Sequence, residues 1–457
     1  MSAVIETAKG AAPDASVALV QGAAGRTIAF GAGPAIDLHR FSREVRAVAA
    51  SLPPARHAVN LCEDRYRFLV AFCAAAVRGQ TTLMPPSRAP AVVAEVMAQY
   101  PDTYCLGDRG PCGAEAMPQH YRQLPAQLPQ ADGDALRVDP DFAIAIGFTS
   151  GSTGRPKPNL KTWTAFRAST LQNLAALHDL LDADRVTPLV ATVPPQHMYG
   201  MEMSILLPLL GGVAVHQARP FFPGDIARAL HDASTPALLV TTPVHLRALV
   251  ESDVALPPLR GVISATAPLS PELARAAEAK LGCEVRELFG STETCVIARR
   301  RTAHDTAWTP LPQVRVSPQP DGTAVHGPHL PQMVVLADLV EVQADGRFEL
   351  RGRNADLLEI AGKRASLGDL TRRLLAVPGV HDGVVFQLEP CPHTGVRRIA
   401  ALAVAPELDA ARILAALRAQ LDPVFLPRML RCVESLPRNE TGKLPRTALI
   451  GLLQDAP

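Results

Sequence analysis

The most informative stretch of the chain is FAIAIGF at residues 142–148, continued by TSGSTGRPK at residues 149–157. The unbroken apolar run predicts a strand that is buried on both faces. The glycines after it let the backbone approach a ligand closely, and the hydroxyl groups and the final lysine supply hydrogen-bond donors. A loop of this composition after a buried strand is typical of phosphate binding. The candidate phosphate ligands are Thr149, Ser150, Gly151, Ser152, Thr153, Gly154 and Lys157.

The spacing of this loop differs from that of a P-loop kinase. Lys157 lies three residues past Gly154 and behind Pro156, so the pattern G-x-x-x-x-G-K-[ST] is absent. From these residues alone, the stretch is either a phosphate-binding loop of another kind or a flexible polar turn.

The composition of the chain restricts its partners. Its 457 residues predict roughly two to four domains, and a hydrophobic fraction of 47% provides for a large core. Lys+Arg is 45 and Asp+Glu is 44, with 4% aromatic residues, which argues against nucleic acid as a partner. No apolar run is long enough to span a membrane, and the first twenty residues do not resemble a signal peptide. The expected address is the cytoplasm, with the scattered cysteines reduced and mostly buried.

Strands and helices alternate through the first three hundred residues, which predicts a parallel α/β sheet. The stretch 107–141 is expected to be a surface connection or a partly irregular region. The expected helices are 37–52, 67–77, 163–181 and 201–210, and the expected strands are 58–62, 82–84, 142–148, 189–193, 238–242, 262–264 and 284–289.

The sequence pattern changes after about residue 310. Asp321-Gly322 and Asp345-Gly346 lie between alternating residues, the pattern of β-hairpins, so residues 311–350 are expected to be antiparallel β. A smaller α+β module follows, with expected helices at 367–375 and 409–421 and expected strands at 383–388, 399–404 and 429–436. We therefore predict a large layered α/β domain with a β-rich subdomain over residues 1–352 and a small, mobile α+β domain over residues 353–457.

Five short motifs in order resemble those of the adenylate-forming enzymes, which include acyl- and aryl-CoA synthetases, adenylation domains and luciferase. They span residues 148–446, and the N-terminal part carries the weakest signal. The motifs are FTSGSTGRPK (148–157), FGSTE (289–293), ADL (337–339), GR (352–353) followed by GKR (362–364), and LPRNETGK (436–443).

The resemblance implies a reaction and a role for each motif. A carboxylic acid attacks the α-phosphate of ATP, giving an acyl-adenylate and pyrophosphate, and a thiol then takes the acyl group. Lys443 is the implied catalytic lysine, and Glu293 the implied Mg²⁺ ligand, with Thr292 beside the α-phosphate. Further implied nucleotide contacts are Phe289, Gly290, Asp338 and Arg353, with Ala265 and Thr266 beside the adenine.

The segment PPQHMYG at residues 194–200 resembles the acid-binding motif of the CoA ligases and aryl-acid activators. It implies substrate contacts from His197, Tyr199 and Gly200. The Asp that amino-acid-activating domains use to hold the substrate amine is absent here, which disfavours an amino acid. As a lone histidine, His197 could equally be structural.

Two positions depart from the family pattern. Ala355 stands where the family has its hinge Asp, and Glu359 stands where the family has a Lys. The motif therefore does not fix the position of the hinge. The sequences NLCEDRYRF (60–68) and GKRASLGDL (362–370) resemble the stand-alone ligases of aryl-polyene and xanthomonadin pigment clusters. This narrower resemblance implies a hydroxybenzoate-like acid and transfer to a holo-acyl carrier protein. The alternatives are an aryl- or acyl-CoA synthetase that uses free CoA, and an inactive adenylate-binding scaffold.

Overall fold

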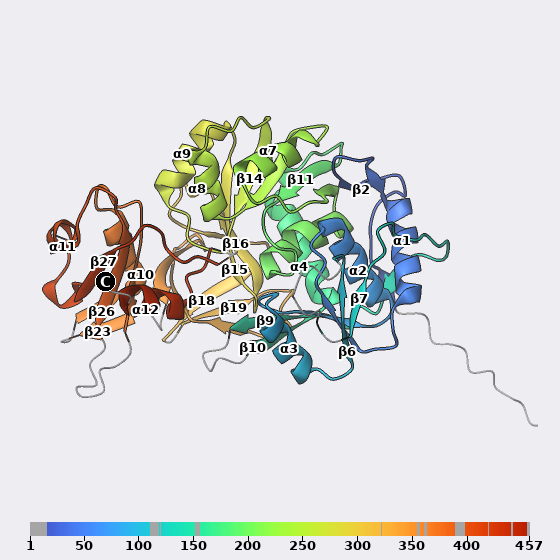
Figure 1. Ribbon diagram of the computed structural model, residues 1–457, viewed down its shortest axis with the longest axis horizontal. Helices are drawn as coiled ribbons and strands as arrows, with labels where there is room; N and C mark the ends of the chain where they lie inside the picture. The colour runs from blue at the N-terminus through green and yellow to red at the C-terminus, as the bar shows by residue number, and fades with distance from the viewer. Residues whose placement is uncertain are drawn as a thin grey trace, which may run out of the picture.

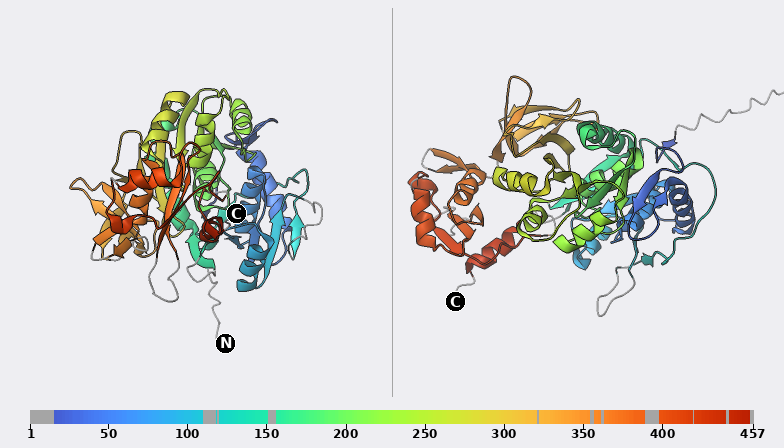
Figure 2. Two further views of the ribbon diagram at one scale, coloured as in Figure 1. Left: turned by 60° about the vertical axis from the view of Figure 1, so that its left-hand side comes forward. Right: turned by 90° about the horizontal axis from the view of Figure 1, so that it is seen from above.

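The computed structural model describes residues 16–109, 118, 120–150, 156–320, 322–353, 357–360, 363–388, 398–418, 420–439 and 442–454. It is an α/β protein with a large N-terminal part and a smaller C-terminal part, the latter lying at one end of the molecule (Figure 1). Seen from above, the C-terminal part stands beside the rest (Figure 2).

A six-stranded sheet carries the strand that the sequence marks as most informative. Its order is β10-β9-β5-β4-β6-β7, and all its neighbours are parallel except the hairpin β9–β10. Its strands are β4 (His57–Asn60), β5 (Thr81–Met84), β6 (Thr103–Gly107), β7 (Tyr121–Gln123), β9 (Ala143–Ser150) and β10 (Pro156–Thr162).

A nine-stranded sheet forms the other half of the large part, in the order β17-β16-β15-β14-β13-β11-β12-β2-β3. Its central strands run parallel, and β3, β16 and β17 pair antiparallel. Its strands are β2 (Thr27–Phe30), β3 (Ile36–Asp37), β11 (Thr187–Ala191), β12 (Val213–His216), β13 (Ala237–Thr241), β14 (Leu259–Ser264), β15 (Val285–Ser291), β16 (Cys295–Arg300) and β17 (Thr309–Pro310).

The helices of the large part begin where the sequence supplies caps. Asp37 caps α1 by accepting from Arg40 N, and Asp64 caps α2 by accepting from Arg67 N. Gly282, at φ 66°, ends α9 in the left-handed conformation that glycine favours. These helices are α1 (Leu38–Ser51), α2 (Arg65–Val77), α3 (Pro90–Gln99), α4 (Trp163–Ala176), α5 (Met198–Met201), α6 (Leu207–Leu210), α7 (Pro223–His231), α8 (Pro243–Glu251) and α9 (Pro271–Leu281).

Several expected elements have different bounds. The helix expected over 163–181 ends at Ala176 and continues as a 3₁₀ turn over His178–Leu180. The helix expected from residue 201 begins at Met198 and contains a π-helical stretch, Glu202–Leu206, before α6. The expected strand 189–193 is β11, which begins and ends two residues earlier.

The predicted antiparallel region is confirmed. β18 (Arg315–Gln319) pairs antiparallel with β19 (Gly322–His326), which pairs with β20 (Val334–Leu336). β21 (Asp338–Val342) pairs antiparallel with β22 (Phe348–Arg353). Within the expected irregular stretch, β7 adds to the six-stranded sheet, and β8 (Arg137–Val138) pairs with β1 (Val17–Ala18).

The chain beyond β22 forms its own hydrophobic clusters. Their buried members all lie between residues 358 and 453, whereas the other clusters are built from residues up to 348. The elements here are β23 (Leu357–Ile360), β24 (Lys363–Ser366), α10 (Leu367–Leu375), β25 (Asp382–Gln387), β26 (Ile399–Val404), α11 (Ala410–Arg418), a 3₁₀ turn (Pro423–Phe425), β27 (Met429–Cys432) and α12 (Arg446–Gln454).

The described cysteines are free, and most of them are buried, as the sequence suggests. Cys112 and Cys391 lie outside the described residues. Among the helices that the structure describes, none is long and apolar enough to cross a bilayer.

Candidate active site

The hairpin β9–β10 carries the candidate nucleotide loop. Thr149 and Ser150 end β9, and Lys157 on β10 lies opposite Thr149 in the antiparallel register. Lys157 is exposed, so its ammonium group is accessible to a ligand. The predicted ligands Gly151, Ser152, Thr153 and Gly154 lie outside the described residues.

A tight turn between β15 and β16 carries Thr292 and Glu293. The turn follows a register shift after Phe289, and a Cβ atom placed on Gly290 would lie 2.1 Å from the carbonyl oxygen of Cys295. Only glycine fits there. Cys295 has φ 58°, which is costly for a residue with a side chain, so surrounding contacts must hold the turn.

The ring of Phe289 lies at the base of this turn. Its centroid is 5.4 Å from that of Trp308 and 6.1 Å from that of Phe348. These contacts fix the aromatic residue of the predicted nucleotide motif against the β-rich region.

Gly147 is the point where three predicted motifs meet. A Cβ atom placed there would lie 2.9 Å from Thr292 Cγ2 and 3.1 Å from Met198 Cε. The strand before the nucleotide loop, the Thr292–Glu293 turn and the acid-binding segment are therefore in contact, although they are far apart in sequence. A side chain at residue 147 would push them apart.

The predicted acid-binding segment, residues 194–200, folds back closely on itself. A Cβ atom on Gly200 would lie 2.0 Å from the carbonyl oxygen of Pro194. The Tyr199 hydroxyl donates to the carbonyl oxygen of Ile263 at 2.9 Å, so this predicted substrate contact is anchored to β14 through its polar end. Met198 and Met201 are buried beside it and give this region an apolar character.

His197 and Lys443 lie close together in space. His197 stands at the N-cap position of α5, and its Nδ1 atom is buried without a hydrogen-bond partner in the described part of the chain. Burial, and after it the positive charge of Lys443, lowers the pKa of His197 to about 4. The histidine is therefore neutral at pH 7, and the lysine reaches it from the C-terminal part of the chain.

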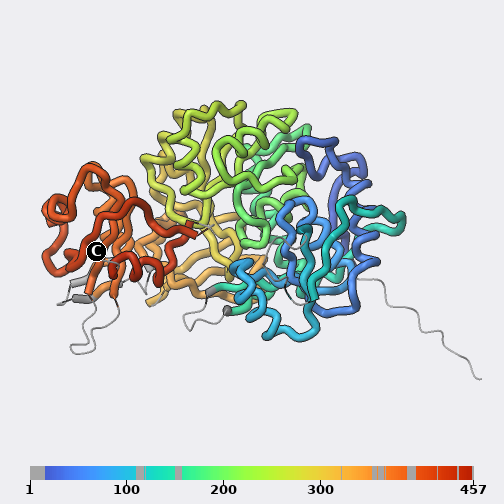
Figure 3. Tube along the Cα trace, viewed as in Figure 1, coloured from blue at the N-terminus to red at the C-terminus, as the bar shows by residue number. Residues whose placement is uncertain are grey.

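The loop that carries Lys443 packs against the large part of the molecule. A Cβ atom on Gly442 would lie 3.2 Å from Val244 Cγ2, at the start of α8, and 3.9 Å from Ala267 Cβ. The backbone N–H of Lys443 donates to Asn439 Oδ1 at 2.9 Å, which shapes the loop from within. In Figure 3 the red C-terminal trace reaches across to the body of the molecule.

The remaining predicted nucleotide contacts lie on separate elements. Asp338 begins β21 and pairs in register with Arg353 at the end of β22. Ala265 is buried just after β14, and Thr266 beside it has a left-handed backbone with φ 83°. The side chain of Arg353 is outside the described structure.

The donor set at this site fits Mg²⁺. Among the described residues no group of three or more His, Cys, Asp or Glu side chains could hold a metal ion by itself. Mg²⁺ takes one or two carboxylates and completes its coordination with phosphate oxygens and water. Glu293 is partly exposed, and its carboxylate makes no hydrogen bond or ion pair within the described part of the chain, so it is accessible to a metal ion.

Two buried cations near the site were not among the predicted site residues. Lys161 on β10 donates from Nζ to the carbonyl oxygen of Glu293 at 2.8 Å. Arg65 donates to the carbonyl oxygens of Ala191 and Val193, both at 2.8 Å, directly before the acid-binding segment. The sequence held a signal for the first: lysine occurs at few positions in a chain whose cations are mostly arginine.

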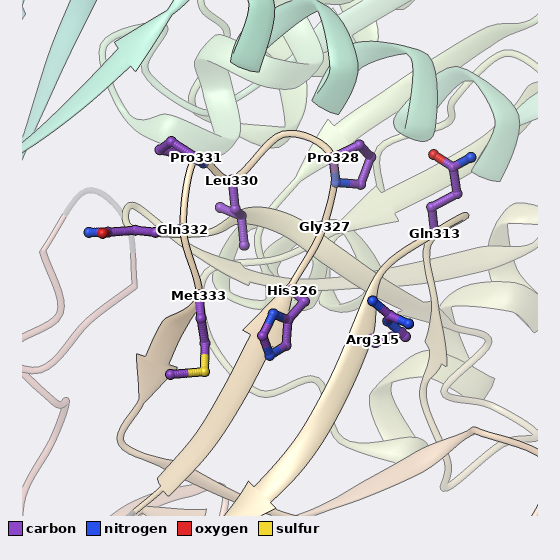
Figure 4. Close-up of a pocket in the computed structure, with 9 residues that line it drawn as sticks. All are labelled: Gln313, Arg315, His326, Gly327, Pro328, Leu330, Pro331, Gln332 and Met333. Carbon is purple, nitrogen blue, oxygen red and sulfur yellow. The ribbon is translucent and has the colours of Figure 1, made fainter.

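A cavity of about 320 Å³ lies elsewhere, between the start of β18 and the loop that joins β19 to β20 (Figure 4). None of the predicted site residues lines it. Its lining residues are Gln313, Arg315, His326, Gly327, Pro328, Leu330, Pro331, Gln332 and Met333.

The buried histidines predict how stability depends on pH. Burial lowers the pKa values of His197, His245 and His329, so the folded protein binds these protons less readily than the unfolded chain. Stability should therefore fall as the pH drops from 6.5 toward 4.

Thermal melts between pH 7.5 and 5 should show a falling Tm, and the fall should be smaller in His197→Gln. The same change at the exposed His39 is the control, and an equal effect at both positions would contradict the prediction.

Comparisons with known proteins show which family the chain belongs to. The AMP-binding enzyme family matches residues 48–327. A 4-coumarate–CoA ligase from Rhodobacter capsulatus is 32% identical over 314 residues, covering 68% of this chain and 77% of that protein. A 3-hydroxybenzoate–CoA/4-hydroxybenzoate–CoA ligase from Thauera aromatica is 24% identical over 417 residues, covering 79% of this chain and 75% of that protein.

The fold agrees with solved structures as well. The O-succinylbenzoate coenzyme A synthetase from Bacillus subtilis, in complex with ATP and magnesium ion, superposes with a TM-score of 0.78 at 17% identity. The match covers 94% of this chain and 97% of that one. The chain belongs to the AMP-binding enzyme family and is a ligase of the acid–AMP and acid–CoA class.

Proposed function

We propose that the enzyme uses ATP and Mg²⁺ to activate an aryl carboxylic acid as its acyl-adenylate, releasing pyrophosphate, and then passes the acyl group to a thiol. The observation that carries this proposal is that the Lys443 loop packs against Val244 and Ala267 of the large part, close enough for the charge of Lys443 to act on His197. It brings the lysine of the C-terminal loop to the acid-binding segment, where the carboxylate and the α-phosphate have to meet.

The chemistry assigns a task to each charged group. The acid and ATP are both anionic, so their approach requires positive charge held in a fixed position. Lys443 neutralises the carboxylate and the phosphate together as the bond forms between them. Neutral His197 borders the acid without adding charge, and Asp338 accepts hydrogen bonds from the ribose hydroxyls. Mg²⁺ bound at Glu293 would neutralise phosphate charge.

The surroundings of the acid site favour a flat, apolar acid. Met198 within the segment and Met201 just after it are both buried, and the sequence here lacks the Asp that amino-acid-activating domains use to hold the substrate amine. Relatives that act on coumarate and on hydroxybenzoates support the same class of substrate. We propose a hydroxybenzoate-like acid of the kind used in aryl-polyene pigment synthesis.

For the acceptor we propose a holo-acyl carrier protein, whose acidic surface suits arginines in the C-terminal part. The structure weakens the charge argument: Arg372 and Arg373 both pair with Asp369, at 2.9 and 3.0 Å. Arg398 is exposed, and Arg397 lies outside the described residues. Free CoA is the second candidate, because the relatives named above are CoA ligases.

A pyrophosphate-release screen of benzoates, cinnamates and fatty acids tests the proposed reaction. Release with a hydroxybenzoate, and none with fatty acids, is the expected result. If none of the tested acids gave pyrophosphate release, the result would support the inactive scaffold instead. Transfer from preformed aryl-adenylate to holo-carrier protein or to CoA then identifies the acceptor, and turnover with CoA alone would overturn the carrier-protein proposal.

We also propose that residues 353–457 form a domain that moves between the two half-reactions. The separate hydrophobic clusters beyond residue 357 support a boundary near residue 353. The proposed hinge, 352–356, lies mostly outside the described residues, including Ala355.

A cross-link tests this movement. A Cβ atom on residue 442 would lie 3.2 Å from Val244 Cγ2, so the experiment places cysteines at residues 244 and 442 and oxidises them. We expect the oxidised Val244→Cys/Gly442→Cys variant to release pyrophosphate but to form little thioester. The reduced form of the same variant is the control, since it carries any strain at residue 442 without the link. Equal loss of both half-reactions on oxidation would contradict the proposed motion.

A further inference from the structure

The turn that carries Glu293 is held by hydrogen bonds to three side chains from separate parts of the chain. Lys161 Nζ donates to the carbonyl oxygen of Glu293 at 2.8 Å. His329 Nε2 donates to the carbonyl oxygen of Thr294 at 2.7 Å. The backbone N–H of Val296 donates to both carboxylate oxygens of Glu202, at 3.1 Å each.

These anchors explain how an unfavourable backbone persists in the turn. Cys295 has φ 58°, a conformation that costs free energy for a residue with a Cβ atom. Contacts on both sides of Cys295 hold it there. The side chain of Glu293 lies on the same turn, so its position depends on these anchors.

Lys161 is an unusual anchor because it is buried. Its exposed fraction is 5%, and a buried ammonium group requires compensation. Glu202, with an exposed fraction of 1%, provides opposite charge nearby and is itself held by Ser169 Oγ at 2.6 Å and Asn173 Nδ2 at 3.0 Å. The hydrogen bond from Lys161 nevertheless goes to the main chain of Glu293, so the charge is directed at the turn.

The residue type fits this task. A lysine places one compact charge on a single carbonyl oxygen, whereas the planar fork of arginine needs more room and several acceptors. The chain uses arginine at most of its cationic positions and keeps lysine here. A lysine therefore suits this buried position, where one compact charge meets one carbonyl oxygen.

We propose that Lys161 is a positioning residue for Glu293: its bond to the Glu293 carbonyl holds the turn so that the carboxylate is presented to the metal of the metal–nucleotide complex. This inference rests on the proposed role of Glu293 as the metal ligand. Residues that orient a metal ligand typically contribute about 10–100-fold to metal affinity.

The test measures metal binding directly, without turnover. Mn²⁺ is titrated into the enzyme with a non-hydrolysable ATP analogue and followed by electron paramagnetic resonance. We expect Lys161→Met to weaken Mn²⁺ binding about tenfold while the affinity for the metal-free analogue stays within about twofold. Lys280→Met is the matched control, because Lys280 also donates to main-chain carbonyls, at the surface between α9 and the end of α8.

A double variant separates positioning from stability. Lys161→Met leaves the Glu202 charge buried and uncompensated, and Lys161→Met/Glu202→Gln removes both charges. We expect the double variant to recover thermal stability but not Mn²⁺ affinity. If Lys161→Met does not fold, the double variant decides alone. Mn²⁺ affinity that is unchanged in the single variant, or restored in the double variant, would overturn the proposal.

Glu293→Gln distinguishes this inference from the function it rests on. If Glu293→Gln weakens Mn²⁺ binding and the Lys161 variants do not, only the positioning role fails. If Glu293→Gln leaves Mn²⁺ binding unchanged, the proposed metal site itself is wrong.

Discussion

Lys443→Ala is expected to lower the rate of pyrophosphate release by about 10²–10³-fold, equivalent to ~3–4 kcal/mol of transition-state stabilisation. In the proposed mechanism the lysine acts where negative charge accumulates as the carboxylate attacks the phosphate, so its loss would raise the barrier. ATP affinity should change little, because the interaction is strongest in the transition state. Pyrophosphate release under saturating substrates and calorimetric ATP binding measure the two quantities.

The same substitution has a spectroscopic consequence. The charge of Lys443 contributes to the lowered pKa of His197, so Lys443→Ala should raise that pKa while burial still keeps it below 6.5. An NMR titration of the imidazole follows this change. Lys280→Ala on α9 is the control for both measurements. Near-normal pyrophosphate release by Lys443→Ala would show that the lysine is not catalytic.

Gly200→Ala is expected to damage both stability and adenylation. The added Cβ atom would lie 2.0 Å from the carbonyl oxygen of Pro194, and backbone on both sides would have to move. Overpacking of this kind costs about 1–3 kcal/mol. The shift also moves His197, three residues earlier, and a misplacement of about 1 Å can cost 10²-fold in rate.

Gly224→Ala provides a control of opposite sign. Gly224 lies in the first turn of α7 with no heavy atom within 4 Å of its would-be Cβ atom, so alanine should stabilise the helix by up to about 1 kcal/mol. Urea unfolding midpoints and pyrophosphate release compare the two variants. Equal stability of Gly200→Ala and Gly224→Ala would mean that the acid-binding segment is looser than the structure indicates.

Local patterns predicted the elements that local interactions dictate. The strand before the nucleotide loop, the helix α10 and the hairpins of the β-rich region follow from hydrophobic runs, caps and turn residues. The helix α3 was not expected, although Pro90 opens it and Val93 and Val96 anchor it in the core. Its apolar residues form a short run whose spacing does not distinguish a helix from a buried strand.

The errors in the site have a common physical cause. The β11 strand ends at Ala191 rather than at residue 193. At this point Arg65 donates to the carbonyl oxygens of Ala191 and Val193 across 126 and 128 residues of sequence. Likewise Lys161 reaches Glu293 across 132 residues. Such contacts depend on how distant segments fold together, and no local pattern encodes them. The proximity of His197 and Lys443 was accessible only through the resemblance of motifs.

Strand β10 links the proposed phosphate site to the proposed metal site through one extended piece of backbone. Lys157 lies beside the nucleotide loop, and Lys161, four residues on, holds the Glu293 carbonyl. An extended strand spans about 13 Å over that distance and changes its length little. A displacement of the strand at either end is therefore transmitted to the other. If the phosphates of a nucleotide fix the position of β10, nucleotide binding raises the affinity of the site for the metal. By thermodynamic reciprocity, metal binding then raises the affinity for the nucleotide by the same factor.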